Sequence, residues 1–234
     1  MMIQSIGGVA CAAVGFMTYA VRGRSSALFG PSVWRGDPGR AAIALTFDDG
    51  PSESTPDLLR VLAGHGARAT FFQCGMHARR LPGIARQVAA AGHEIGNHGD
   101  THAPFYLRSP QTIYAQLARA QEAIAAATGV TPRLFRAPYG CRWFGLRAAQ
   151  RRLGLMGVMW TAVARDWKLA APAVAARLVQ AARNGAILCL HDGRVAQTSP
   201  DIRVTIEAMR ALLPALAEKG YHFETVSELL CPKN

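Results

Sequence analysis

Short hydrophobic runs alternate with amphipathic stretches along the chain from about Ala41 onward. Apolar runs bounded by Gly, Pro or polar residues are typical of buried strands, and an apolar residue at every third or fourth position is typical of helices. The pattern predicts strands at Ala41–Phe47, Ala67–Gln73, His93–Asn97, Arg133–Arg136, Leu155–Val163, Ala186–Leu190 and Tyr221–Thr225. Strands that alternate with helices form a parallel sheet, so we predict an α/β fold.

Capping residues mark where the predicted helices begin and end. Thr55–Pro56 combines an N-cap residue with Pro in the first turn, and Gly64 ends that helix. Ser109–Pro110 opens a longer helix that ends at Gly129. Ser199–Asp201 caps a late helix with one hydrophobic face. Each of these helices lies between two predicted strands, as a β/α architecture requires.

Residues 1–37 precede this pattern and contain a hydrophobic stretch, Ile3–Val21, that is rich in Gly and Ala. Its length is close to the ~20 residues that cross a bilayer, which predicts a membrane anchor or an atypical signal sequence. No Lys or Arg precedes it, which argues against a secretory signal, whereas Arg22 and Arg24 follow it. We therefore expect one catalytic domain over residues 38–234 and membrane association through residues 3–21, at the membrane or cell envelope, with the side left open.

The composition agrees with one domain that has a large core. The chain has 234 residues, half of them hydrophobic. The net charge of +11 comes mostly from Arg scattered through amphipathic segments, and no nucleic-acid-binding motif accompanies it. We expect no nucleic-acid partner; an anionic polymer or membrane fits the charge equally well. The five Cys residues lack the short paired spacing of zinc sites, and an odd number cannot form a closed disulfide set.

Polar residues of catalytic type follow the predicted strands at their carboxyl ends. They are Asp48 and Asp49 after the first strand, His98 and His102 after the third, Arg136 at the fourth, Asp166 after the fifth, and His191 with Asp192 after the sixth. In β/α barrels this face carries the active site. The sequence therefore predicts that these residues share one site.

A metal site is the first chemistry that this set permits. His98 and His102, together with a carboxylate from a neighbouring strand end, form the three-ligand set of catalytic zinc, which leaves a fourth position for water. Asp48 and Asp49 point to opposite sides of an extended chain, so one can bind metal while the other accepts protons. An ordinary turn at Asp-Asp-Gly-Pro and an isolated surface His pair are the simpler alternatives.

His191 is the candidate general acid. It lies beside Asp192 and near Asp166, and a carboxylate partner orients an imidazole and favours its protonated form. A buried core histidine is the simpler alternative. Arg136 is followed by a Pro that stiffens the turn, which suits a fixed guanidinium and a Tyr139 whose backbone N–H is held in place.

Together these motifs resemble the polysaccharide deacetylase family, carbohydrate esterase family 4, whose catalytic unit is the NodB homology domain. The matching segments occur in order at Thr46–Gly50, His98–His102, Arg136–Tyr139, Asp166–Trp167 and His191. The resemblance covers most of the chain after residue 38. It implies a distorted (β/α) barrel of about seven parallel strands.

The resemblance also implies roles for the residues that match. Asp48 would be the general base, and Asp49 would bind a divalent ion together with His98 and His102. Arg136 would steady the base. The ion implied is Zn²⁺, with Co²⁺ as an alternative that such a ligand set also accepts.

The remaining matches imply the acid and the walls of the substrate groove. His191 would be the acid, tuned by Asp166, and the backbone N–H of Tyr139 would help to hold the oxyanion. Trp167 would form a wall of the groove. Cys189 stands where the family has a groove-lining Leu, so its contact with substrate is expected to differ.

Two further departures fall at Gly99, which replaces a hydroxyl residue, and at Val163, which replaces the first Asp of the fourth motif. The departures spare the expected metal ligands and proton-transfer groups, so they put substrate fit in question more than chemistry. We expect a metal-dependent hydrolase that removes N-acetyl groups from N-acetylglucosamine-type sugars in a polysaccharide or oligosaccharide such as chitin oligomers or peptidoglycan. A hydrolase of a small or cyclic amide, and a glycan-binding module without turnover, are the alternatives.

Overall fold

The computed structural model describes the backbone of residues 2–194 and 197–231, and the side chains of residues 11–194 and 197–231. Its strands are β1 (Ser32–Val33), β2 (Ala42–Asp48), β3 (Thr70–Gln73), β4 (Glu94–Asn97), β5 (Leu134–Phe135), β6 (Met156–Val158), β7 (Ala162–Val163), β8 (Ile187–His191) and β9 (His222–Glu224). Its helices are α1 (Met2–Arg22), α2 (Thr55–Gly64), α3 (Gly75–Arg80), α4 (Pro82–Ala90), α5 (Pro110–Thr128), α6 (Leu146–Leu153), α7 (Ala171–Ala181), α8 (Arg203–Glu218) and α9 (Val226–Leu230), with a 3₁₀ turn η1 (Pro138–Gly140).

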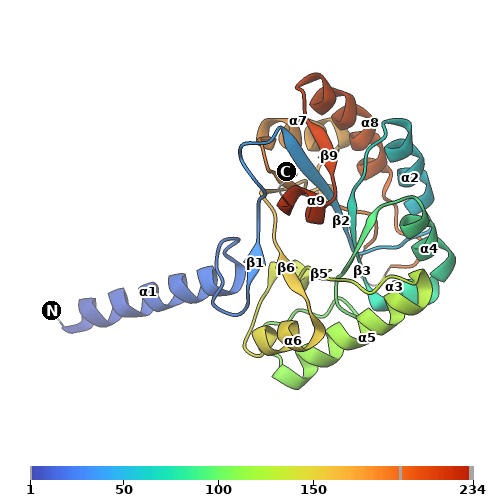
Figure 1. Cartoon of the computed structure of the whole chain (residues 1–234). Coiled ribbons are helices and arrows are strands. Elements are labelled where there is room, and N and C mark those ends of the chain that lie inside the picture. Colours follow the sequence, from blue (N-terminus) through green and yellow to red (C-terminus); the bar gives the residue numbers. More distant parts are fainter. Residues whose placement is uncertain (1, 195–196, 232–234) are drawn as a thin grey trace.

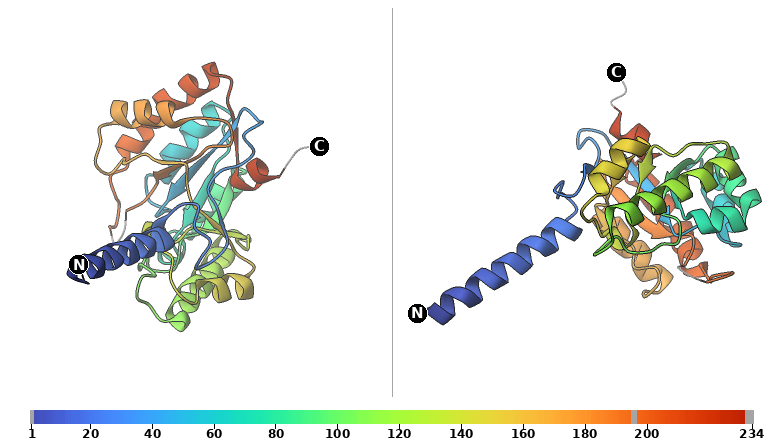
Figure 2. Two further views of the ribbon diagram at one scale, coloured as in Figure 1. Left: turned by 90° about the vertical axis from the view of Figure 1, so that its left-hand side faces the viewer. Right: turned by 90° about the horizontal axis from the view of Figure 1, so that it is seen from below.

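In the part of the chain that the structure describes, nine strands form one curled sheet (Figure 1). The strand order is β1-β6-β5-β4-β3-β2-β8-β7, and β9 pairs with β2. All of these pairs are parallel. Helices α2 to α8 lie around the outside of the sheet (Figures 1 and 2). The predicted α/β fold with a distorted parallel barrel is confirmed.

The core lies between the central strands and the helices outside them. Phe47 of β2 and Phe71 of β3 are fully buried and stack with their ring centroids 5.0 Å apart. Leu188 of β8 and Leu212 of α8 belong to the same buried cluster. Because helices cover these strands, their sequences read as continuous hydrophobic runs with little alternation.

One predicted strand, Leu155–Val163, is wrong as a single element because the structure divides it into β6 and β7. Strand β6 pairs with β1 and β5, whereas β7 pairs with β8 at the opposite end of the strand order. Between them, the Met159 N–H donates to the Val33 carbonyl and the Thr161 N–H to the Ile187 carbonyl, both at 2.7 Å. This short connection therefore runs from one end of the curled sheet to the other.

The predicted helix boundaries are confirmed for α5, whereas α2 ends at Gly64 as predicted but has Ser54 in place of Thr55 at its N-cap, and the last predicted helix is shifted. At α5, the Ser109 side chain accepts a hydrogen bond from the Thr112 N–H, and Gly129 ends the helix with a φ of 77°. Helix α8 begins at Arg203, after the expected cap. There the Asp201 carboxylate accepts from the Arg203 N–H at 2.9 Å as a turn outside the helix.

Helix α1 extends away from the sheet, and only its carboxyl end packs on the rest of the protein (Figures 1 and 2). Val21 is buried there, and its carbonyl accepts from the Arg142 N–H at 3.0 Å. Farther out, Val14 and Phe16 are more than half exposed. Among the described residues no helix has the length and apolar character of a bilayer span. The side chains of residues 3–10 lie outside the described part, so membrane association through residues 3–21 stays a prediction.

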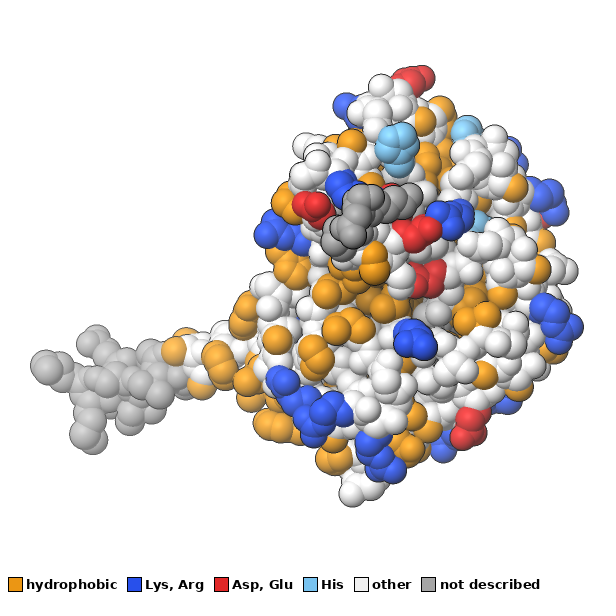
Figure 3. All heavy atoms as spheres, in the orientation of Figure 1, with side chains coloured by type: hydrophobic (Ala, Val, Ile, Leu, Met, Phe, Trp, Pro, Cys, Tyr) orange, Lys and Arg blue, Asp and Glu red, His pale blue; other side chains and the backbone are white. Residues whose placement is uncertain are grey.

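Basic side chains are spread over many elements of the surface. On the face drawn in Figure 3, blue Lys and Arg side chains lie over several parts of the molecule, with few red acidic side chains among them. This agrees with the expected scattering of the +11 net charge.

Candidate active site

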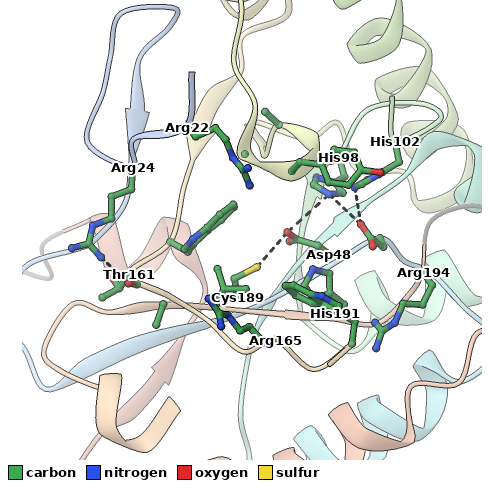
Figure 4. A pocket seen from close by; sticks show the side chains of 18 of the residues that line it. Arg22, Arg24, Asp48, His98, His102, Thr161, Arg165, Cys189, His191 and Arg194 are labelled. Carbon is green, nitrogen blue, oxygen red and sulfur yellow. Dashed lines mark hydrogen bonds and ion pairs between the residues drawn. The ribbon is translucent and has the colours of Figure 1, made fainter. Parts of the chain in front are cut away.

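Parallel pairing places the carboxyl ends of the central strands at one edge of the sheet. Asp48 at the end of β2 pairs with His191 at the end of β8 and with Phe72 of β3. Asn97, the last residue of β4, pairs with Phe135 of β5. The loops that follow these strands therefore start side by side, and Figure 4 shows the side chains that they carry converging on one pocket.

Of the ten residues predicted for the site, eight line this pocket: Asp48, Asp49, His98, His102, Tyr139, Trp167, Cys189 and His191. The other two, Arg136 and Asp166, are buried behind it and bind two of the lining residues. The sequence prediction of one shared site is therefore matched by the positions of all ten residues. Their chemical roles depend on the distances and hydrogen bonds between these side chains.

Asp49, His98 and His102 form a buried group of three potential metal ligands. The Asp49 Oδ1 lies 3.3 Å from the His98 Nε2 and 3.0 Å from the His102 Nε2. Ligand atoms at about 2.0–2.2 Å from a tetrahedral Zn²⁺ ion lie roughly 3.3 Å from one another. The spacing of the donor atoms thus fits a single small divalent cation.

The backbone helps to aim these ligands. The Nδ1 of His98 lies 2.8 Å from the Arg136 carbonyl, and donation from that nitrogen leaves the Nε2 lone pair available for a metal. Among the described residues, the buried Nδ1 of His102 has no hydrogen-bond partner. The Nε2 atoms of both imidazoles thus lie near the same Asp49 oxygen, and Figure 4 shows His98 and His102 side by side at the pocket.

The protonation states of the trio also suit metal binding. Burial disfavours the charged form of Asp49, but its close contacts with the His102 and His98 imidazoles outweigh this and hold the Asp49 pKa well below 3.8. Burial lowers the pKa of His102, against the opposing effect of Asp49. An ionised carboxylate beside a neutral imidazole is the state that binds a cation without first losing a proton.

Unusual backbone conformations are concentrated at this pocket. In the described part of the chain, six residues other than Gly have a positive φ, and four of them line the pocket: Asp49, His102, Tyr139 and Arg165, with φ values of 71°, 55°, 56° and 61°. The left-handed conformation costs a residue with a Cβ about 1–2 kcal/mol. Such strain is typical of residues whose side-chain direction serves a site.

Asp48 is held by a buried arginine. The Arg136 Nη1 donates to the Asp48 Oδ1 at 2.6 Å and to the Thr46 hydroxyl at 2.8 Å. The Arg136 side chain is fully buried, and its Nε and Nη2 donate to the carbonyls of Val158 and Met159, both at 3.2 Å. The guanidinium is thus satisfied on every side, which fixes the carboxylate that it binds.

His191 has a carboxylate partner on the side away from the pocket. Its Nδ1 lies 2.8 Å from the Asp166 Oδ1, and its backbone N–H donates to the Asp166 Oδ2 at 2.9 Å. The Thr205 hydroxyl of α8 also donates to that oxygen, at 2.7 Å. Burial lowers the pKa of His191, but the hydrogen bond and charge of Asp166 outweigh it, so the pKa is raised above 6.5. This arrangement favours a protonated imidazole at neutral pH.

The pocket has a volume of about 820 Å³ and aromatic walls. The Tyr139 ring meets the His102 ring edge-on, with centroids 4.6 Å apart, and the Trp167 ring meets the His191 ring in the same way at 4.9 Å. Both aromatic side chains are half exposed, at 50% and 54%. A cavity of this size with aromatic faces accommodates a sugar ring and its neighbours.

The residues that depart from the expected motifs keep the site intact. Gly99 has a φ of 78°, which Gly adopts without strain, and its N–H donates to the Asn97 side chain at 2.8 Å. Val163 lies in β7 and lines the pocket. Cys189 is buried, and its Sγ lies 3.4 Å from the Asp48 Oδ2, so it contacts the expected base as well as the pocket.

Some residues at the site were not predicted from the sequence. Thr205 contacts Asp166 from a helix that lies 39 positions farther along the chain, and no motif marks it. By contrast, Asp192 was expected at the site because it follows His191; it is buried, and burial together with the charges of Asp49 and Asp48 raises its pKa to about 7. Arg22 and Arg24 line the pocket, although in the sequence they read as the flank of a hydrophobic segment. Their role could not be found without the fold.

A parallel β/α barrel with a His₂Asp ligand set and a flanking Asp and His defines a protein of metallohydrolase type. The chain belongs to the polysaccharide deacetylase family: the family model described as polysaccharide deacetylase matches residues 35–158. The sequence is similar to that of a chitooligosaccharide deacetylase of Bradyrhizobium sp. (strain ANU 289), with 34% identity over 200 residues, 82% of this chain and 91% of the relative.

Two further matches are an enzyme and a pseudoenzyme of the same family. The peptidoglycan-N-acetylglucosamine deacetylase PgdA of Listeria monocytogenes is 34% identical over 189 residues, which are 80% of this chain and 38% of that protein. The crystal structure of a CE4 family pseudoenzyme from Bacillus anthracis matches with a TM-score of 0.78 and 28% identity, over 87% of this chain and 70% of that one. Because the family fold also occurs in a pseudoenzyme, the catalytic groups must be judged residue by residue.

Proposed function

We propose that this protein is a metal-dependent hydrolase of carbon–nitrogen bonds other than peptide bonds. It removes N-acetyl groups from N-acetylglucosamine-type sugars in an oligosaccharide or polysaccharide of the chitin-oligomer or peptidoglycan class. One observation carries the proposal: a buried Asp49, His98 and His102 trio lies beside an arginine-bound Asp48 and a carboxylate-bound His191. A glycan-binding module has no need of such a pair of proton-transfer groups.

Asp49, His98 and His102 would hold one divalent ion. We propose Zn²⁺, because a set of one carboxylate and two imidazoles with an open position is typical of catalytic zinc, and Co²⁺ as the alternative. When bound, the ion would supply Lewis acidity and lower the pKa of a water molecule to about 7. The buried surroundings of the three ligands would keep them in place.

Asp48 would accept the proton of the water that attacks the acetyl carbonyl. Its Oδ1 is occupied by Arg136, so its Oδ2, which faces the thiol of Cys189, is the oxygen left for this work. The fixed guanidinium limits the rotation of the carboxylate and keeps that oxygen toward the pocket. A general base in this position contributes about 10²–10⁴-fold to the rate.

His191 would donate a proton to the departing amine. Its Nδ1 is bound to Asp166, which leaves the Nε2 to serve the substrate. The raised pKa keeps the imidazole protonated at neutral pH, as an acid requires. The backbone N–H of Tyr139 would help to hold the oxyanion, and Trp167 would bind the sugar face.

Acetate release from metal-loaded protein tests the proposal. The substrates would be chitin oligomers, peptidoglycan fragments and, in parallel, small and cyclic amides, with bound metal measured on the same samples. We expect acetate from the glycans and its loss in Asp48→Asn. Hydrolysis of the small amides alone would replace the substrate class, and metal-loaded protein that binds glycan without releasing acetate would make the chain a binding module. A location at the cell envelope belongs to this proposal, because glycans of these classes lie there.

A further inference from the structure

Arginine side chains dominate the charge of the pocket outside the catalytic groups. Five of them line it: Arg22, Arg24, Arg165, Arg177 and Arg194. The acidic residues of the described lining are Asp48, which is paired with Arg136, and Asp49, which contacts His98 in the ligand trio. Acetamido sugars without further substituents carry no charge, so a neutral glycan leaves this basic wall without a function.

Two of the pocket arginines, Arg24 and Arg177, are held by uncharged groups. The Arg24 Nη1 donates to the Thr161 carbonyl at 2.8 Å, and its guanidinium lies over the Trp34 ring at 4.5 Å. The Nε of Arg177 donates to the Val163 carbonyl, also at 2.8 Å. Within the described part of the chain, neither arginine forms an ion pair with a carboxylate. Each guanidinium is therefore oriented while its charge stays available to a ligand.

Some arginines elsewhere on the surface are paired with carboxylates. Arg68, Arg80 and Arg203 each form an ion pair with a neighbouring Glu or Asp. The excess of basic over acidic residues in the whole chain explains why some arginines lack partners. Arginines without an ion pair among the described residues also lie outside the pocket, Arg86 and Arg210 for example, but the pocket combines five arginines with only two carboxylates, both of which already have partners.

One departure of the sequence from the family's motifs also makes the pocket less acidic. The family's fourth motif begins with Asp, and this chain has Val163 at that position, on the wall of the pocket. The Arg177 side chain lies against this residue and binds its backbone carbonyl. The substitution removes a carboxylate that would otherwise offset the charge of Arg177.

Two of the arginines come from a part of the chain that precedes the residues matched by the family model. Arg22 is the last residue of α1, Arg24 lies two residues after it, and the side chains of both line the pocket (Figure 4). The segment is fastened by Arg142, whose guanidinium donates to the carbonyls of Gly23 and Ser26. The part of the basic wall that Arg22 and Arg24 form is thus held to the rest of the fold.

We infer that the substrate is an N-acetylated glycan that also carries an oxyanion, a phosphate or a carboxylate, close to the acetamido group. The inference rests on the proposed deacetylase function and narrows its substrate class. Guanidinium groups bind carboxylate and phosphate through paired hydrogen bonds, and a pocket of one charge sign attracts such ligands from solution. Arg24 and Arg177 make the direct contacts, because both are fixed by backbone carbonyls.

The test compares three versions of one N-acetylglucosamine oligomer: neutral, phosphorylated, and carrying a carboxylate. The ratio of kcat/KM for each anionic oligomer to that for the neutral one is measured by acetate release at low salt. A hydrogen bond to a charged group contributes about tenfold. We expect a ratio of about ten or more for at least one anionic oligomer, and whether the phosphate or the carboxylate gives it identifies the source of the oxyanion.

Variants locate the effect. Arg24→Gln and Arg177→Gln should each lower the ratio about tenfold, and the Lys variants should retain part of it. Arg210→Gln removes the same charge from an exposed position on α8 outside the pocket and should leave the ratio unchanged. A similar fall in Arg210→Gln would mean a general charge effect and overturn the inference.

The two proposals fail in different ways. A ratio near one, with acetate released from the neutral oligomer, would overturn the anionic substrate and leave the deacetylase function standing. No acetate from any of the three oligomers, with metal bound, would overturn the deacetylase function and this inference with it. A ratio that is high and insensitive to Arg24 and Arg177 would also refute the inference, because the selectivity would then arise outside this wall.

Discussion

Asp166→Asn provides a sharp test of His191 as the general acid. The substitution keeps the size of the side chain and removes the charge that faces the imidazole. The hydrogen bond between His191 Nδ1 and Asp166 Oδ1 is 2.8 Å long, and the Asp166 side chain has no exposed surface. Such a charge-assisted hydrogen bond contributes about 1.5–3 kcal/mol, and one pKa unit corresponds to about 1.4 kcal/mol. We therefore expect the pKa of His191 to fall by about 1–2 units.

The sign of the effect on activity follows from the role of an acid. His191 works when protonated, so activity is lost as the pH rises through its pKa, and a lower pKa moves this alkaline limb to lower pH. The assay is kcat/KM for acetate release between pH 5 and 10, on protein with measured metal content. Asp201→Asn makes the same chemical change at an exposed position and should leave the limb where it is. An unmoved limb in an active Asp166→Asn protein would refute His191 as the acid.

Stability should change over a defined range of pH for the same reason. The pKa of His191 is raised above 6.5, so its contribution is complete below about pH 6.5 and is lost as the pH rises through the folded-state value. Burial raises the pKa of Asp166, but its hydrogen bond with His191 outweighs this and lowers it below 3.8, so its contribution is lost as the pH falls through that lowered value. Denaturant unfolding should show Asp166→Asn about 1.5–3 kcal/mol less stable at pH 5.5, and closer to the parent at pH 9.

Three other predictions follow from the buried charges of the site. Asp48→Asn should lower kcat about 100-fold or more and also destabilise the fold, measured by acetate release and denaturant unfolding, because it leaves Arg136 buried beside a neutral group. Saturating Zn²⁺, at about 100 times its Kd, should raise the free energy of unfolding by about 3 kcal/mol, and His102→Ala should abolish the increase; an equal increase in the variant would place the metal elsewhere. Asp192→Asn should raise the free energy of unfolding of the metal-free protein by about 2–4 kcal/mol at pH 8 and change it little at pH 4. The pKa of Asp192 is about 7 in the folded protein and lower in the unfolded chain, so the ionised carboxylate destabilises the fold once the pH exceeds the unfolded-state pKa. Equal stability of parent and variant at pH 8 would contradict this.

The sequence predicted the positions of the candidate catalytic residues well because the physical rule is simple. Carboxyl ends of parallel strands meet at one edge, so residues that follow such strands come together whatever their separation along the chain. The pairing of Asp48 with His191 across β2 and β8 is an instance, with 143 positions between them. Two buried strands recognised by their apolar runs were enough to predict this contact.

The division of one predicted strand into β6 and β7, and the arginines that line the pocket, could not be predicted from this rule. The break between β6 and β7 depends on Val33 and Ile187, which bind the connection from opposite ends of the sheet. The hydrophobic pattern within the segment does not indicate which distant strands it pairs with. Likewise, Arg22 and Arg24 have the sequence context of a membrane flank, and only the fold brings them to the pocket.

Arg136 shows why the site behaves as one unit and not as a set of separate groups. Its guanidinium fixes the Asp48 carboxylate, and its backbone carbonyl accepts the hydrogen bond from His98 Nδ1. One residue at the end of β5 therefore orients both the expected base and an expected metal ligand. Since a fully buried guanidinium is costly unless every donor is satisfied, the same contacts that stabilise the fold also set the chemistry. Changes that loosen the core under Arg136 should therefore disturb metal binding and proton transfer together, even when no residue of the pocket itself is altered.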